Sequence, residues 1–280
     1  SQMTDGLFDC TIEPVMEAWG FTTQNFRIPS EEELEELLSH VDYKQVDLEN
    51  SAVTIPEDVR LDLGGIAKGF TSSRVMDIFR INGVTSGIIS LGGNVQALGH
   101  KPDGNMWRVG IQDPHDLNST FAVVEVADQA VITSGGYQRY FEENGQTYHH
   151  IIDPETGYPA DSGLLSVTVV SADHLLADAL STALFVAGPE VALDFWRSRD
   201  DFELVLCTDQ GELLVTEGLE DVFTFAGADR GYTYEIARRC APPAHAAGQR
   251  GGPAGGRRRR GAAFFSSAGG EQLFDRLRRL

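Results

Sequence analysis

The sequence predicts a soluble globular protein that mixes helices with β-strands, and three observations carry this prediction. Residues 164–170 form a β-branched run typical of a buried strand, and an apolar helical pattern follows it up to Gly188. Residues 107–114 and 121–126 alternate in the manner of antiparallel strands. The apolar fraction is 41%, and no run approaches the ~18 consecutive apolar residues of a membrane span. With 280 residues, one large domain and two lobes are both possible.

The first helix signature begins at Ser30. Ser30 is suited to cap the helix N-terminus, and Glu33 stands three residues later, as in a capping box. Leu34, Leu37 and Leu38 then supply an apolar stripe at helical spacing. We expect this helix to be structural.

Three predicted strands, at residues 59–63, 87–91 and 130–134, each run into a pair of glycines. The pairs are Gly64-Gly65, which opens a helix reaching about Arg80, Gly92-Gly93 and Gly135-Gly136. Glycines at strand ends permit positive φ and let a ligand approach main-chain N–H groups closely. A shared nucleotide cleft is one interpretation. Three independent turns are the other, since no pair belongs to a full GxGxxG or Walker motif.

Two adjacent histidines, His149 and His150, stand at the end of a predicted strand. An Asp153-Pro154 turn follows them directly. Histidine is the side chain best suited to proton transfer near neutral pH, so this pair is a candidate for acid–base chemistry. A purely structural histidine is the alternative interpretation.

The helix that precedes Gly188 carries a pair of oxygen-bearing side chains. Asp178 and Thr182 lie one turn apart, on the side opposite the apolar face. The apolar face consists of Leu176, Leu180, Ala183, Leu184 and Ala187. A carboxylate and a hydroxyl at i and i+4 suit a hard cation such as Mg²⁺. We expect both side chains to point away from the core, toward a metal or, alternatively, simply toward solvent.

The elements after Gly188 are a further helix and a hairpin. The helix is predicted over residues 189–199, and the hairpin joins residues 203–207 to 212–215 around Asp209-Gln-Gly211. The globular pattern is expected to end near Phe225.

Charge is distributed unevenly between the body of the chain and its tail. The net charge is −20, but residues 238–280 hold ten of the 22 basic and two of the 42 acidic residues, which leaves about −28 on the first 237 residues. From Ala237 onward the chain is rich in Ala, Gly, Pro and Arg without an apolar face, and we expect disorder there. Such an acidic body repels nucleic acid, and an anionic substrate would need a metal or a local basic site.

Cysteine usage argues against two kinds of site. Cys10, Cys207 and Cys240 are odd in number and lack CxxC spacing, which speaks against a disulfide framework and against a zinc site.

The first residues have neither the basic nor the apolar segment of an export signal.

Six short motifs occur in an order that matches a known family. They are Asp5-Gly-x-Phe-Asp9-x-Thr11, Asp62-Leu-Gly-Gly65-x-Ala-Lys68-Gly69, Gly92-Gly93-Asn94, Thr133-Ser134-Gly135, His150-Ile-Ile-Asp153-Pro154-x-Thr156-Gly157 and Ala177-Asp178-Ala-x-x-Thr182. Together they resemble the ApbE family of FAD:protein FMN transferases over about residues 3–225. Each motif alone is weak, but six in register are specific.

The resemblance implies an α+β fold, a T-fold-like domain of two lobes with a flavin cleft between them. It places an ApbE-like flavin transferase domain at residues 1–236 and leaves residues 237–280 as a low-complexity tail. Family members begin several dozen residues earlier than this chain, so we expect N-terminal strands and some flavin-contacting side chains to be missing here.

The resemblance also implies a set of site residues. Mg²⁺ would be held by Asp178, Thr182 and a main-chain oxygen of Gly65. Ser181 stands where some members have a further Asp, which implies weaker or water-completed ligation. His150 matches the proposed catalytic base. The contacts to FAD map onto Leu7, Phe8, Asp9, Asp62, Lys68 and Ile152.

The implied reaction is Mg²⁺-dependent transfer of FMN from FAD to a Thr or Ser hydroxyl of a partner protein, with release of AMP. Acceptors in the family include subunits of sodium-pumping NADH:quinone reductases and Rnf-type complexes. An FAD pyrophosphatase and a non-catalytic FAD-binding protein are the alternatives. The resemblance further implies a bacterial, extracytoplasmic lipoprotein whose membrane anchor is not part of this chain.

Overall fold

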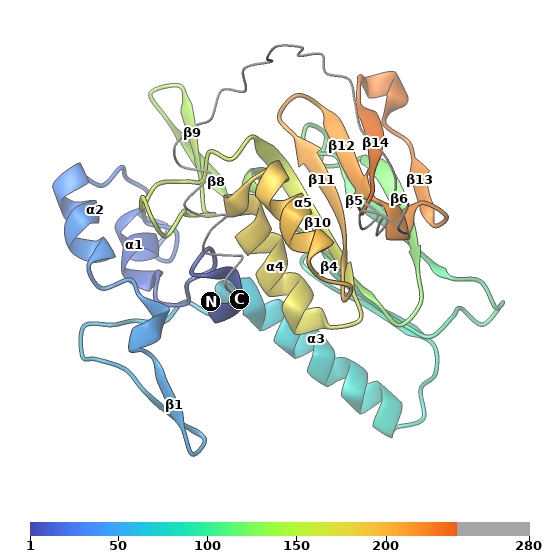
Figure 1. Ribbon diagram of the computed structural model, residues 1–280, viewed down its shortest axis with the longest axis horizontal. Helices are drawn as coiled ribbons and strands as arrows, with labels where there is room; N and C mark the ends of the chain where they lie inside the picture. Colours follow the sequence, from blue (N-terminus) through green and yellow to red (C-terminus); the bar gives the residue numbers. More distant parts are fainter. Residues whose placement is uncertain (240–280) are drawn as a thin grey trace, which may run out of the picture. The chain divides into compact units, whose positions relative to one another are not determined.

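A seven-stranded sheet forms the centre of the structure, a computed structural model that describes residues 1–239 (Figure 1). All neighbouring strands are antiparallel except β12 and β14, which are parallel. In spatial order the strands are β14 (Thr233–Ala237), β12 (Glu212–Thr216), β11 (Glu203–Thr208), β10 (Leu164–Ser171), β7 (Ala130–Gly135), β4 (Asn94–Leu98) and β3 (Gly87–Leu91). The predicted strands at 87–91, 130–134, 164–170, 203–207 and 212–215 are confirmed.

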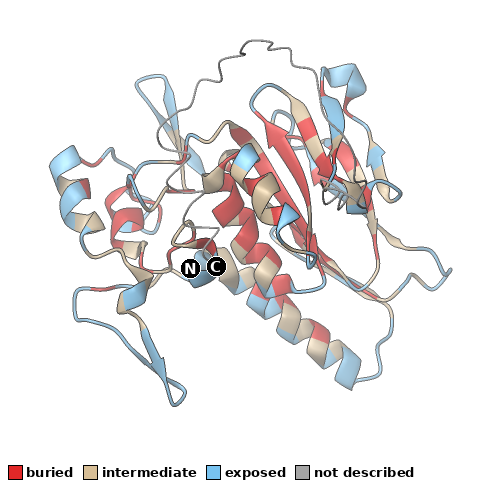
Figure 2. Ribbon diagram, viewed as in Figure 1, coloured by how far each residue is buried: buried red, intermediate tan, exposed pale blue. Residues whose placement is uncertain are grey.

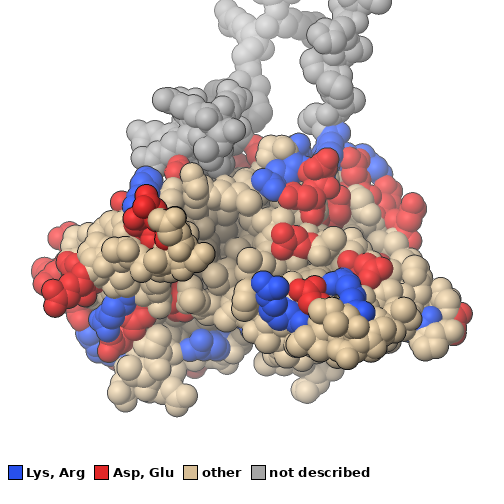
Figure 3. Space-filling model, turned by 90° about the horizontal axis from the view of Figure 1, so that it is seen from below, with Lys and Arg blue, Asp and Glu red and all other residues tan. Residues whose placement is uncertain are grey.

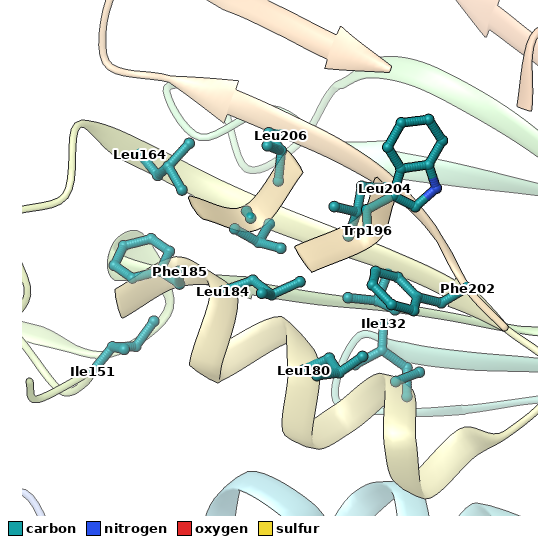
Figure 4. Close-up of a cluster of buried hydrophobic side chains, with 14 of the residues drawn as sticks. Ile132, Ile151, Leu164, Leu180, Leu184, Phe185, Trp196, Phe202, Leu204 and Leu206 are labelled. Atoms are coloured by element: carbon teal, nitrogen blue, oxygen red, sulfur yellow. The ribbon is translucent and has the colours of Figure 1, made fainter. Parts of the chain in front are cut away.

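One face of this sheet is covered by two helices, α4 (His174–Ala187) and α5 (Pro189–Arg197). Leu180 and Leu184 of α4 pack with Leu204 and Leu206 of β11, and Trp196 of α5 lies beside them (Figure 4). These residues are buried. In Figure 2 much of α4 and of the strands beneath it is red, whereas α5 is mostly tan and pale blue. The apolar face predicted for α4 therefore does face the core.

A three-stranded sheet covers the opposite face. Its order is β13 (Phe223–Phe225), β6 (Thr120–Val126) and β5 (Trp107–Gln112), which confirms the antiparallel pair predicted there. Residues of β10 and β11 alternate between the two cores: Val169 and Leu204 face the helices, whereas Val170 and Val205 face the small sheet. Burial on both sides explains why these strands are continuous apolar runs.

The N-terminal residues and the segment around residues 140–152 form a smaller lobe with its own core, which we call the N-terminal lobe. It contains α1 (Glu13–Ala18), α2 (Glu31–Leu38) and two hairpins, β1 (Asp47–Glu49) with β2 (Ala52–Thr54) and β8 (Tyr140–Glu143) with β9 (Gln146–His149). Ser30 caps α2 as predicted, because its side chain accepts a hydrogen bond from the Glu33 N–H. Trp19 is fully buried in this core, and its Nε1 donates to the Gly157 carbonyl at 2.7 Å.

Five short 3₁₀ segments complete the described elements. They are Gln2–Thr4, Tyr43–Gln45, Gly136–Gln138, Glu217–Leu219 and Ala228–Arg230. The mixture of helices and mainly antiparallel sheets confirms the α+β class. Within residues 1–239, no helix is both long and apolar enough to cross a membrane.

The strand predicted at residues 59–63 is wrong. Val59 is buried, but this segment pairs with no strand of the described chain. The Asp62 N–H donates to the Cys10 carbonyl at 2.8 Å, and Arg60 forms ion pairs with Glu13 and Glu17 of α1. The segment is therefore held against the N-terminal lobe as irregular chain.

The expectation that the globular pattern ends near Phe225 is also wrong. Strand β14 follows and adds a parallel edge to the main sheet. Its first three residues are exposed, so it lacks the alternation that marks a half-buried strand. Arg238 directly after it forms ion pairs with Glu217 and Glu220. The predictions for residues 237–280 fall, from Cys240 onward, outside the described residues and stay predictions.

Helix α3 (Gly64–Ile81) packs closely against α4, and Gly69 is at the point of closest approach. A Cβ added to Gly69 would lie 2.4 Å from the His174 carbonyl oxygen and 2.8 Å from the Asp178 Cβ. Since the first neighbour is backbone, no side-chain rotation relieves the overlap. The contact of α3 with α4 therefore requires glycine at this position.

We expect Gly69→Ala to lower the free energy of unfolding by about 1–3 kcal/mol, the usual cost of overpacking. In an exposed helix the same change stabilises by about 1 kcal/mol, so the sign of the effect reports the close contact. Urea denaturation measures both. Thr71→Ala, at an exposed position of the same helix, is the matched control and should stay within about 0.5 kcal/mol of wild type. A Gly69→Ala variant as stable as this control would contradict the packing argument.

Candidate functional site

A cavity of about 820 Å³ lies between the N-terminal lobe and the main sheet. Its walls come from segments far apart in the chain: the loop before α1, the start of α3, the turn between β3 and β4, the end of β7, the residues after β9, and α4. Ten of the eleven predicted site residues line it. They are Leu7, Phe8, Asp9, Asp62, Gly65, Lys68, His150, Ile152, Asp178 and Thr182.

Ser181 is the predicted site residue that does not line the cavity. Its side chain is fully buried. The hydroxyl donates to the carbonyl oxygen of Asp178 at 2.8 Å and lies 2.7 Å from the Ser134 hydroxyl. The Ser181 side chain thus fastens α4 to the end of β7 in this structure.

Two of the three glycine pairs contribute directly to the cavity wall. Gly64-Gly65 and Gly92-Gly93 line it, whereas the third pair, Gly135-Gly136, is flanked by two residues that do, Ser134 and Tyr137. Gly92 and Gly93 have φ values of 58° and 93°, which residues other than glycine rarely adopt. A common cleft, rather than three unrelated turns, is therefore the correct interpretation of the three pairs.

Asp178 is buried, contrary to the expectation that it points outward from a helix surface. Helix α3 and the start of β4 cover this side of α4, so the side chain is 3% exposed. One carboxylate oxygen, Oδ2, accepts a hydrogen bond from the Gly69 N–H at 2.8 Å, and Oδ1 accepts one from the Asn94 side-chain amide at 2.8 Å. A single carboxylate thus joins α4 to α3 and β4.

Burial raises the pKa of Asp178, and hydrogen bonds from Gly69 and Asn94 and the charge of Lys68 only partly oppose the rise. The Lys68 Nζ lies 4.0 Å from Oδ1, beyond hydrogen-bonding distance. A buried carboxylate with so distant a counter-charge is stabilised by a further cation. The donor chemistry at this wall therefore fits Mg²⁺.

The first turn of α3 supplies a further oxygen that suits Mg²⁺, the carbonyl oxygen of Gly65. In a regular α-helix the Gly69 N–H would donate to the Gly65 carbonyl, four residues earlier. Its donation to Asp178 competes with that bond, which leaves the Gly65 oxygen more available to another partner. Thr182, the other proposed ligand, lies on the cavity wall with its hydroxyl 3.3 Å from that of Ser134.

The N-terminal loop is fixed against α3 by its own hydrogen bonds. Asp9 is buried and accepts from the N–H and hydroxyl of Thr11 and from the N–H of Tyr43. Phe8 packs over Gly65 so closely that a Cβ there would lie 2.6 Å from its ring. The side chain of Asp62 accepts from the Gly64 N–H at 2.6 Å. Asp9 and Asp62 therefore shape the cavity wall as well as lining it.

His150 is half-buried on the cavity wall, immediately after β9. Its backbone N–H and its Nδ1 both lie near the Arg139 carbonyl oxygen, at 3.0 and 3.1 Å. Burial lowers the pKa of His150 to about 4, with the positive charge of Arg139 as the next cause. The neighbouring His149 instead bonds to the Ala160 carbonyl and packs edge-on against Phe185. Of the two adjacent histidines, His150 is the one exposed to the cavity.

Several cavity residues were missed by sequence reasoning. They include Phe21, Thr22, Gln112, Leu117, Gln138 and Arg139. Asn94, which contacts Asp178, stood in one of the six motifs but was given no role. Asn94 and Arg139 each stand within three residues of a glycine pair, which was a usable signal. Gln112 ends β5 and Leu117 lies in the loop between β5 and β6, and nothing local marks them.

Known proteins with similar sequences and structures share one description. The sequence profile of the ApbE family matches residues 1–206. A FAD:protein FMN transferase of Klebsiella pneumoniae is 33% identical over 236 residues, which cover 83% of this chain and 72% of that protein. One of Treponema pallidum is 37% identical, over 68% of this chain and 57% of that protein.

Solved structures agree with these sequence relatives. The crystal structure of an ApbE protein from Thermotoga maritima is 39% identical and superimposes with a TM-score of 0.74, covering 79% of this chain and 73% of that one. A flavin transferase ApbE from Vibrio cholerae is 30% identical with a TM-score of 0.69, covering 79% and 72%. The chain thus spans between about half and three quarters of the length of the proteins it matches.

Proposed function

Because this chain belongs to the ApbE family, we propose that it transfers the FMN portion of FAD to a hydroxyl group of a partner protein and releases AMP. The observation that carries the proposal is the shared cavity wall of Asp178, Lys68 and His150. These residues supply an anionic metal ligand, a cation and a base from three separate segments, in a cavity of about 820 Å³.

The transfer is a displacement at phosphorus. The oxygen of the acceptor hydroxyl forms a bond to the phosphorus on the FMN side of the pyrophosphate, and the bond from that phosphorus to the oxygen of AMP breaks. AMP leaves with the bonding electron pair, and the proton of the hydroxyl passes to a base. The products are a phosphoester-linked flavin and AMP.

We assign the base to His150. Its Nδ1 lies against the Arg139 carbonyl, a pure acceptor, so Nε2 is the nitrogen that can take a proton. A pKa of about 4 keeps the imidazole neutral at pH 7, the form in which it can act as a base.

Asp178 and Thr182, with the main-chain oxygen of Gly65, would hold Mg²⁺. Mg²⁺ bound there would neutralise the charge that develops on the pyrophosphate. Asp178 is prepared for this role by burial, and Lys68 adds a positive charge that attracts the phosphates. Local positive charge matters because the first 237 residues carry about −28.

The acceptor is proposed to be a Thr or Ser in a partner protein, with subunits of sodium-pumping NADH:quinone reductases or Rnf-type complexes as candidates from the family resemblance. In Figure 3, acidic side chains are scattered over the face shown and basic ones stand among them in separate groups. Such a surface favours acceptor segments with neutral or basic flanks. Localisation outside the cytoplasm rests on the resemblance alone and stays a prediction.

Incubation with FAD, Mg²⁺ and an acceptor protein tests the function. We expect the denatured acceptor to remain fluorescent and to gain the mass of one FMN on a Thr or Ser, with an equal amount of AMP released. Free FMN and AMP without labelled acceptor would indicate an FAD pyrophosphatase instead. Bound FAD that stays intact would indicate a binding protein.

His150→Asn should slow flavin transfer by about 10²-fold or more, since general bases usually contribute 10²–10⁴-fold. Asn retains a donor for the Arg139 carbonyl but has no basic nitrogen. FAD affinity, measured by fluorescence quenching, should change little. His149→Asn is the control, because the His149 side chain hydrogen-bonds to the Ala160 carbonyl and His149 does not line the cavity. Equal loss of FAD binding and rate in His150→Asn would make His150 a flavin contact.

Asp178→Asn should abolish stabilisation by Mg²⁺ while the protein stays folded. An isosteric amide can accept from Gly69 and donate to a reoriented Asn94 amide, whereas Asp178→Ala would leave both groups unpaired. We expect millimolar Mg²⁺ to raise the melting temperature of wild type and not that of Asp178→Asn. Asp77→Asn, at a partly exposed position of α3, is the control. An unchanged Mg²⁺ response in Asp178→Asn would refute the metal assignment.

A further inference from the structure

Arg139 occupies a position between the cavity and the N-terminal lobe. It lies between the 3₁₀ segment Gly136–Gln138 and strand β8, and it lines the cavity. Its guanidinium donates to the Phe21 carbonyl, in the chain that follows α1. Its own carbonyl oxygen is the acceptor for His150. The backbone of Arg139 therefore contacts His150, and its side chain contacts Phe21, whose ring lies beside the imidazole.

The backbone of Arg139 selects the tautomer of His150. A carbonyl oxygen can only accept, so the His150 nitrogen at 3.1 Å, Nδ1, must carry the proton. In the neutral ring the lone pair then belongs to Nε2. The second bond to the same oxygen, from the His150 backbone N–H at 3.0 Å, fixes the position of the residue.

The side chain of Arg139 acts on His150 by charge and by packing. Burial is the largest cause that lowers the pKa of His150, and the charges of Arg139, His149 and Lys68 lower it further, whereas the hydrogen bond to the Arg139 carbonyl raises it. Arg139 has the largest effect of the three. The Phe21 ring, whose carbonyl receives the guanidinium, lies edge-on to the imidazole with centroids 6.3 Å apart.

We propose that Arg139 is a positioning residue that holds His150 as a neutral imidazole, with the proton on Nδ1 and the lone pair on Nε2 available to the acceptor hydroxyl. The contribution of Arg139 to catalysis rests on the proposed function, whereas the effect of Arg139 on the His150 imidazole does not. The hydrogen bond to the Phe21 carbonyl holds the guanidinium, and with it the positive charge, beside the ring.

A nuclear magnetic resonance titration of ¹⁵N-labelled histidine tests this directly, with His150 assigned by its loss in His150→Asn. In wild type we expect the Nδ1–H tautomer and a midpoint near 4. Arg139→Gln should move the midpoint toward the ordinary value of 6.5, and Arg139→Lys should keep it low. A wild-type Nε2–H tautomer, or an unmoved midpoint in Arg139→Gln, would overturn the proposal.

A matched control is Arg230→Gln. The Arg230 guanidinium also donates to backbone carbonyls, those of Thr120 and Ala226 at 2.6 and 3.0 Å, and it does not line the cavity. This variant should leave the His150 titration unchanged. If Arg139→Gln does not fold, the wild-type tautomer and the Arg139→Lys midpoint decide the question.

Flavin transfer supplies a second readout. The transfer rate of Arg139→Gln should fall most at pH 6 and recover toward that of wild type at pH 8, because only the protonated imidazole is inactive. FAD affinity should not follow this pH dependence. Absence of transfer in wild type with every acceptor would refute the proposed function and leave the titration result standing. A rate loss independent of pH would refute the role of Arg139 in holding the imidazole neutral.

Discussion

The carboxylate of Asp178 is the interaction on which the rest of the site depends. It takes a hydrogen bond from the backbone of α3 and another from the first residue of β4, and so joins three elements that are distant in sequence. Gly69 makes this possible, since any side chain would separate α3 from α4. The glycine pair that begins α3 then leaves room for the Phe8 ring of the N-terminal loop. The buried carboxylate of Asp178 therefore holds together the elements that form this cavity wall.

Local patterns predicted much of the scaffold. The spacing of Leu180 and Leu184 indicated the core face of α4, and Ser30 with Glu33 indicated the start of α2. The same logic failed where partners are remote. Helical periodicity places Asp178 away from the apolar face of α4, but it cannot show that α3 and Asn94 of β4 cover that side. Val59 has the apolar character of a strand residue, yet it is buried in a segment that pairs with no strand of the described chain.

The residues that line the cavity were indicated better by ordered motifs than by chemistry inferred from single residues. His150 and Asp178 were ambiguous alone, because a surface carboxylate and a structural histidine are common. Arg139 shows what remains out of reach. Its influence depends on a backbone carbonyl that any residue would supply and on a guanidinium directed at the Phe21 carbonyl, more than a hundred residues earlier. Such a contact appears only once the chain has folded.

Trp19 has a spectroscopic consequence. It is fully enclosed in the core of the N-terminal lobe, with its indole N–H bonded to Gly157, so its emission belongs to an apolar and rigid environment. Met16 and Phe21 of the same core also line the cavity. Oxidised flavin absorbs where tryptophan emits, so a flavin in the cavity would accept energy from this indole. Quenching of Trp19 emission would therefore report flavin bound in the cavity. Release of the N-terminal lobe from the main sheet would shift the Trp19 emission to longer wavelength.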